Sequence, residues 1–92
     1  MAGKMVWSTE YGACSSSGNG ALNLTEVNRW WSYMNTNLIS SNAWAIETNG
    51  ETSSVFVGSA SATGPWPDSQ ITEWGRNEFA YIASRYPVTM SQ

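Results

Sequence analysis

Histidine is absent from this chain, and cysteine occurs once, at Cys14. The lack of histidine excludes catalysis by a histidine general base and removes the ligand that most zinc sites use. A single cysteine allows no internal disulfide, and without a histidine partner Cys14 is expected to be an inert small side chain rather than a nucleophile. The sequence therefore predicts no metal site and no thiol chemistry.

Charge is scarce as well. Charged residues make up 12% of the chain, about half of the usual ~25%, and the net charge is −3. The basic residues Lys4, Arg29, Arg76 and Arg85 lie too far apart in sequence to form a patch that neutralises phosphates, so we expect no nucleic-acid partner. No apolar run approaches the ~20 residues of a membrane span, and no signal peptide follows Met1, so we expect no membrane contact.

Apolar and aromatic side chains are abundant by contrast. Hydrophobic residues make up 41% of the 92 positions, and six of them are tryptophans. This length allows one domain at most. A chain this short buries only ~60–65% of the surface of its unfolded form, so much apolar surface has to be covered with few charges to keep it solvated.

Two stretches have the composition of β-strands, at residues of about 4–10 and 38–46. The first contains the β-branched and aromatic run from Val6 to Thr9, and the second is small and apolar without strict alternation. A polar loop follows each of them.

Two further stretches have helical periodicity, at residues of about 24–36 and 72–86. Asn23 or Thr25 is positioned to cap the first helix and Thr72 the second, while Pro87 ends the second and Gly75 is expected to permit close packing on the sheet. The first apolar face is predicted to comprise Val27, Trp30, Trp31 and Met34. The second is predicted to comprise Phe79, Ile82, Ala83 and Tyr86.

The order strand, helix, strand, helix predicts an α/β unit whose two strands are parallel and joined by a right-handed crossover. Such a sheet has two open edges and one bare face, which a lone monomer leaves exposed. We therefore expect a homo-oligomer. Four copies would supply the eight strands that close a barrel, and a dimer that covers apolar surface is the simpler alternative.

Glu10 occupies a position at which chemistry is often found. It lies at the end of the first predicted strand, where Gly12 opens the chain into a loop. In parallel α/β folds, catalytic side chains sit at the carboxyl ends of strands. The alternative is an ordinary glutamate that points into water. If strand alternation holds, Glu10 shares a face with Val6 and Ser8, and Trp44 shares one with Asn42 and Ile46. Glu10 and Trp44 are then expected to line one pocket.

Three segments in order resemble the C-terminal end of a glycoside hydrolase family 5 cellulase, a (β/α)8-barrel endo-β-1,4-glucanase. They comprise the strand-seven motif Thr9-Glu10-Tyr11-Gly12, the strand-eight motif Asn42-Ala43-Trp44-Ala45-Ile46 with the loop to Ser54, and the closing segment from Gly58 to Trp66 with Gln70, Ile71, Thr72 and Gly75. The resemblance runs from Lys4 to about Tyr86. It implies a βαβα fragment of a TIM barrel, comprising strands seven and eight and their helices.

The resemblance also implies roles for individual residues. Glu10 corresponds to the family's nucleophile in retaining hydrolysis of β-1,4-glucan, and Trp44 to the residue that stacks on sugar beside the scissile bond. Tyr11 and Glu51 are the other substrate-binding candidates that it places. It implies a secreted parent enzyme, a β-glucan oligosaccharide or polysaccharide as substrate, and no cofactor.

The sequence departs from the family at two points. Glu47-Thr48-Asn49 stands where some relatives have an Asp-Lys pair, and the family's acid/base glutamate, which belongs to the fourth strand, has no counterpart here. Glu47 and Glu51 are the nearby carboxylates, and we expect both to be solvated loop residues rather than a second catalytic group.

Two other functions are open on this sequence. Trp7, Trp44, Trp66 and Trp74 with Tyr11 would suit a carbohydrate-binding surface without turnover. The chain would otherwise be a purely structural barrel fragment that self-assembles.

Overall fold

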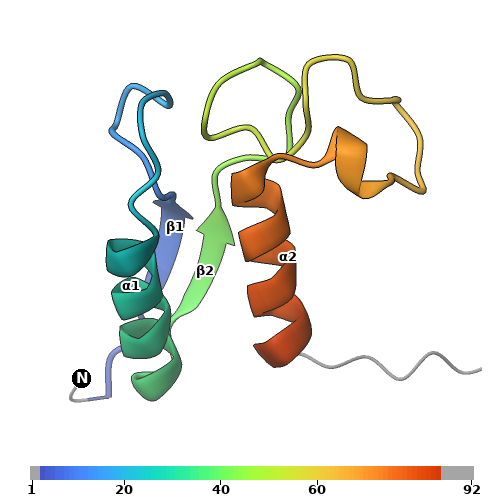
Figure 1. Ribbon diagram of the computed structural model, residues 1–92. Helices are drawn as coiled ribbons and strands as arrows, with labels where there is room; N and C mark the ends of the chain where they lie inside the picture. Colours follow the sequence, from blue (N-terminus) through green and yellow to red (C-terminus); the bar gives the residue numbers. More distant parts are fainter. Residues whose placement is uncertain (1–2, 86–92) are drawn as a thin grey trace, which may run out of the picture.

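The computed structural model describes residues 3–85, which form a parallel two-stranded sheet and two long helices. In chain order the elements are β1 (Trp7–Tyr11), α1 (Leu24–Thr36), β2 (Ser40–Ala43), the short 3-10 helix η1 (Asp68–Gln70) and α2 (Glu73–Arg85). Figure 1 shows α1 beside β1 and α2 beside β2, with the long loops gathered at the end of the sheet to which both strands point. The parallel strands, each followed by a helix, confirm the predicted α/β fold class.

Both strands are shorter than the sequence predicts. The predicted second strand continues to residue 46, but β2 ends at Ala43 because the chain then changes its partner. Ala45 donates its N–H to the carbonyl of Ser53 and accepts from the N–H of Val55, each at 3.0 Å. The backbone groups of Ala45 are thus satisfied by the following loop rather than by β1.

A β-bulge interrupts the pairing near the end of β1. Ser8 pairs with Ser41 and Tyr11 pairs with Ala43, so Thr9 and Glu10 together stand opposite the one residue between these partners. A bulge adds one residue to one strand and shifts the alternation of side chains beyond it. Glu10 lines one groove with Val6 and Ser8, the residues with which alternation groups it, and Tyr11 beyond the bulge lines the same groove.

Helix α1 packs on the sheet through an apolar stripe. The side chain of Asn23 caps it by accepting the N–H of Glu26 at 3.0 Å. Val27, Trp31 and Met34 are buried as predicted, but Trp30 is 53% exposed. Trp30 lies one position before the buried Trp31, at the margin of the stripe that faces the open edge of β1.

Helix α2 buries a different face from the one predicted. Its buried residues are Trp74, Gly75 and Glu78, whereas Phe79, Ile82 and Ala83 are exposed. The reason is the aromatic stack that joins the two helices: the ring of Trp31 lies parallel to Trp74 and to Tyr81, and so sets which side of α2 turns inward. Tyr86 and Pro87, which the sequence predicts in and after this helix, lie outside the described residues.

The loop between β2 and α2 contributes to the core. Val55 and Phe56 are buried, and Phe56 forms an antiparallel bridge with Ile71. Thr72 caps α2 as predicted, because its hydroxyl accepts the N–H of Gly75 at 3.0 Å. A Cβ on Gly75 would collide with the carbonyl oxygen of Val55, so this glycine packs closely against the loop and not, as predicted, on the sheet.

Within residues 3–85, no helix has both the length and the apolar content that crossing a membrane requires.

Candidate functional site

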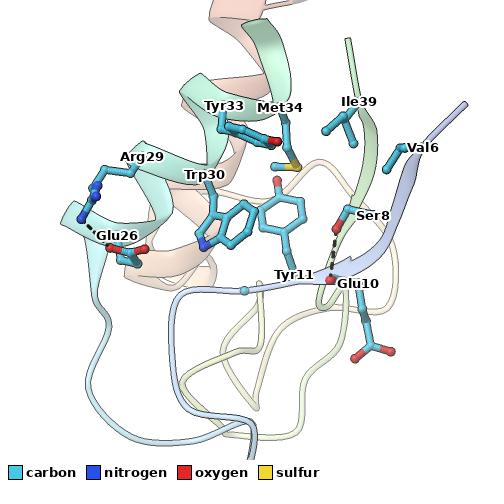
Figure 2. A pocket seen from close by; sticks show the side chains of 11 residues that line it. Val6, Ser8, Glu10, Tyr11, Glu26, Arg29, Trp30, Tyr33, Met34 and Ile39 are labelled. Atoms are coloured by element: carbon cyan, nitrogen blue, oxygen red, sulfur yellow. Dashed lines mark hydrogen bonds and ion pairs between the residues drawn. The ribbon is translucent and has the colours of Figure 1, made fainter. Parts of the chain in front are cut away.

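The carboxylate of Glu10 is exposed at the loop end of the sheet. Its backbone carbonyl accepts a hydrogen bond from the hydroxyl of Ser8 at 3.3 Å, while no hydrogen bond or ion pair holds its carboxylate within the described residues. Figure 2 shows this side chain pointing away from the rings of Tyr11 and Trp30. The position of Glu10 is therefore set by the backbone on either side of it.

Tyr11, the next residue, is held firmly. Its hydroxyl accepts the indole N–H of Trp31 at 2.9 Å and donates to the carboxylate of Glu78, whose two oxygens lie at 2.7 and 2.8 Å. Its ring meets Trp74 edge-on, with 6.2 Å between centroids. Burial, followed by the hydrogen bond to Glu78, raises the pKa of the Tyr11 hydroxyl well above its usual value. This geometry favours an anchoring role for Tyr11 over the predicted contact with substrate.

Glu78 is a buried carboxylate that the sequence did not single out. It is 5% exposed, and burial raises the pKa of its carboxyl, while the hydrogen bond from Tyr11 partly opposes that rise. A glutamate in a helix is normally solvated. The signal that could have found it is the spacing of Trp74, Glu78 and Tyr81, which places all three on one helix face.

Trp44 follows β2 and connects the two strand ends. Its N–H donates to the carbonyl of Tyr11 at 2.7 Å, and its carbonyl accepts the indole N–H of Trp74 at 2.9 Å. Its peptide bond to Ala45 is cis. The Trp44 side chain is 46% exposed, which leaves a ring surface open to a ligand.

The predicted site residues do not gather in one cavity. A groove of about 780 Å³ between β1 and α1 is lined by Glu10 and Tyr11, together with Trp30, Tyr33 and other residues (Figure 2). Trp44 does not line it. Glu51 lines a separate pocket of about 470 Å³, beside Thr72 and Trp74.

Neither loop glutamate stands with Glu10. Glu47 accepts hydrogen bonds from Asn49 at 3.0 Å and from Ser54 at 3.3 Å. Glu51 lies in the other pocket. Among residues 3–85, no three histidine, cysteine, aspartate or glutamate side chains are placed to hold a metal ion.

The tryptophans proposed as sugar platforms differ in accessibility. Trp74 is 0% exposed, so its prediction as a platform is wrong; its ring belongs to the core. Trp66 packs on Phe56 with 4.6 Å between ring centroids and is 36% exposed. Trp7 is 58% exposed, and its indole N–H donates to Asn42 at 2.7 Å, which orients the ring on the sheet surface.

Comparison with known proteins agrees with this architecture. The chain is 36% identical over 73 residues to an endoglucanase from Clostridium saccharobutylicum, and 32% identical over 83 residues to endoglucanase Z from Dickeya dadantii. These alignments cover 79% and 89% of this chain, but 16% and 17% of the relatives. The chain thus spans about a sixth of the length of these curated relatives. No family model matches it.

Solved structures give the same result. A protein from Cytophaga hutchinsonii is 34% identical, with a TM-score of 0.78 over 86% of this chain and 26% of its own. A GH5 cellulase from an Icelandic hot spring isolate is 26% identical, with a TM-score of 0.75 over 95% of this chain and 28% of its own. The chain therefore resembles, in sequence and in fold, a βα portion of a glycoside hydrolase family 5 cellulase, a TIM-barrel protein.

Proposed function

We propose that this chain carries the nucleophile edge of a retaining β-1,4-glucanase site, with Glu10 as the nucleophile. The observation that supports this most is the place of Glu10: an exposed carboxylate at the loop end of a parallel strand, directly before a firmly anchored residue. In the reaction, a carboxylate oxygen of Glu10 attacks the anomeric carbon, and the bond to the leaving oxygen breaks with its electron pair. Water then hydrolyses the glycosyl-enzyme ester.

Trp44 is the proposed sugar platform of this site. Its ring is 46% exposed, and its backbone ties the end of β2 to Tyr11 and Trp74. A structural neighbour, an endoglucanase from Thermobifida fusca, was solved in complex with cellotetraose, which supports a β-1,4-linked glucan as the ligand class. Glu51 is proposed as a more distant substrate contact. We propose a secreted parent enzyme.

We propose that the acid/base group comes from outside the described residues, because Glu47 and Glu51 do not line the groove of Glu10, and Glu26, which does, is ion-paired with Arg29 at 3.2 Å. We propose that other copies of this chain cover its open surface. The exposed apolar side chains of β1 and α2, such as Trp7 and Ile82, are the surface that such copies would bury. A molar mass equal to that of the monomer, measured by light scattering, would contradict this part of the proposal.

The test of the function is release of nitrophenol from a nitrophenyl cellobioside by this chain and by Glu10→Gln, purified in parallel. An activated leaving group needs little help from an acid, whose loss by itself lowers rates by roughly 10²–10⁴-fold. We expect the unmodified chain to release nitrophenol and Glu10→Gln to release none above buffer. Equal rates would contradict the assignment of Glu10.

A binding function without turnover is the second candidate, favoured by the exposed rings of Trp7 and Trp44. Affinity electrophoresis in β-glucan separates the two candidates. Retention that Trp44→Ala abolishes, without any nitrophenol release, would favour binding alone. Retention unchanged in Trp44→Ala would exclude Trp44 as the platform.

A further inference from the structure

The side chain of Glu10 has no support of its own. It lies in the bulge between the Ser8–Ser41 and Tyr11–Ala43 pairs, where β1 has one residue more than β2. Its carboxylate has no hydrogen bond or ion pair within residues 3–85. A catalytic group on such a stretch is held by the residues that end the bulge. The next paired residue in the chain is Tyr11.

Tyr11 is fixed through both its backbone and its ring. Its carbonyl accepts the N–H of Trp44 at 2.7 Å, and its hydroxyl lies between Trp31 and Glu78. The direction of these hydrogen bonds follows from the chemistry. An indole N–H can only donate, so the Tyr11 oxygen accepts from Trp31, and its one proton is directed to Glu78. Glu78 thereby sets the orientation of the hydroxyl.

We propose that Glu78, on α2, is a positioning residue for Glu10. It acts through the hydroxyl of Tyr11, the residue of β1 that follows Glu10. The inference rests on the proposed role of Glu10 as nucleophile. Glu78 touches neither Glu10 nor the exposed surface, and its effect passes along the backbone from Tyr11 to its neighbour.

The charge of Glu78 gives this arrangement a dependence on pH. The group that faces it is the Tyr11 hydroxyl from β1, which in turn accepts the Trp31 indole N–H from α1; Tyr11 is titratable, and so is Tyr81, which acts electrostatically on Tyr11. Burial raises the pKa of the Glu78 carboxyl. Once ionised, it accepts a charge-assisted hydrogen bond from Tyr11, which is stronger than a neutral one. The Tyr11 hydroxyl is therefore oriented most strongly when Glu78 is ionised, even though the desolvation of that charge lowers the stability of the folded chain as a whole.

A glutamine at this position would fill the same space and accept the same proton, so a purely structural role does not need the charge. The comparison of glutamate with glutamine therefore isolates the positioning role. Glu73→Gln is the matched control, because Glu73 lies on the same helix and is exposed.

The experiment is an NMR titration of the chain, labelled with ¹³C at the glutamate carboxyls and with ¹⁵N at the amides. We expect the amide signals of Glu10 and Gly12 to shift with the same midpoint as the carboxyl carbon of Glu78. The shift should vanish in Glu78→Gln and persist in Glu73→Gln. Amide signals that titrate with another midpoint, or that still shift in Glu78→Gln, would overturn the proposal.

The kinetic arm measures nitrophenyl cellobioside hydrolysis. In the unmodified chain, kcat should rise with pH with the same midpoint as the titration of Glu78. We expect Glu78→Gln to lower kcat about 10-fold at an unchanged KM and to lack this rise. An unchanged kcat and pH profile would overturn the positioning role. A chain that shows the amide coupling in NMR and releases no nitrophenol at any pH would contradict the proposed function instead, so the two failures are distinct. If Glu78→Gln does not fold, the titration of the unmodified chain still decides whether the end of β1 follows Glu78.

Discussion

Trp74 is the residue whose replacement should affect both halves of the molecule. It is 0% exposed, lies parallel to Trp31 at 6.1 Å between ring centroids, and donates its indole N–H to the carbonyl of Trp44 at 2.9 Å. Phenylalanine keeps an aromatic ring at this position but removes the donor and one ring of the indole. Trp74→Phe therefore tests how far α2 holds the end of β2 in place.

The magnitude follows from two losses. Leaving the Trp44 carbonyl without its donor costs about 1–3 kcal/mol, and the lost apolar contact costs about 1 kcal/mol more. The free energy of unfolding should fall by ~2–4 kcal/mol, a large share of the ~5–15 kcal/mol of a typical domain. With a urea dependence of about 2 kcal/mol per molar, the unfolding midpoint should drop by ~1–2 M.

Urea unfolding followed by circular dichroism at the helix band measures this loss without relying on tryptophan fluorescence. Trp30→Phe is the control, because Trp30 is 53% exposed and a surface change of this kind alters stability by about 0.5 kcal/mol or less. Equal midpoint shifts in the two variants would refute the conclusion that α2 supports the sheet through Trp74.

Three other outcomes are expected. Gly75→Ala should lower the free energy of unfolding by about 1–3 kcal/mol in the same urea assay, because its methyl group meets the Val55 carbonyl oxygen; a neutral result would show that the loop moves aside freely. Asn23→Ala should cost ~1 kcal/mol and lower the thermal midpoint, since the N–H of Glu26 loses its capping acceptor, and an unchanged midpoint would argue against that cap. The raised pKa of Glu78 means that the folded chain binds its proton more tightly than the unfolded chain, so the stability that Glu78 contributes is present at acidic pH and lost as pH rises through its folded pKa. The urea midpoint of the unmodified chain should therefore fall over this pH range, and that of Glu78→Gln should not. A fall of the same size in Glu78→Gln would contradict Glu78 as its cause.

The sequence predicted the elements that depend on local pattern. The stripe of Val27, Trp31 and Met34 repeats with the helical period, and the caps Asn23 and Thr72 have the short polar side chains that helix starts favour. The parallel order of the strands followed from the helix between them.

What the sequence could not predict depends on contacts between distant residues. The bulge at Thr9 and Glu10 contains no glycine or proline to mark it, and it brings Tyr11 into the groove that Val6, Ser8 and Glu10 line. Glu78 was not singled out from the sequence, because Tyr11, which donates to its carboxylate, lies 67 positions away in the chain. The exposure of Phe79 follows from the aromatic stack that turns α2 about its axis, which no periodicity within α2 specifies.

In the candidate site, too, the features set by local pattern were predicted and those set by distant contacts were not. Glu10 was placed correctly at the exposed end of a strand, because the loop that begins at Gly12 marks that end. Its grouping with Trp44 was inferred from alternation and is not reproduced as a shared cavity.

The role of Glu10 as a nucleophile is tested most directly by trapping the covalent intermediate. The chain is incubated with a dinitrophenyl 2-fluoro-cellobioside, whose fluorine slows hydrolysis of the glycosyl ester, and its intact mass is measured before and after peptide mapping. We predict one added fluorocellobiosyl group per chain, located on the peptide that contains Glu10 and absent from Glu10→Gln. No adduct, or an adduct that persists in Glu10→Gln, would contradict the account.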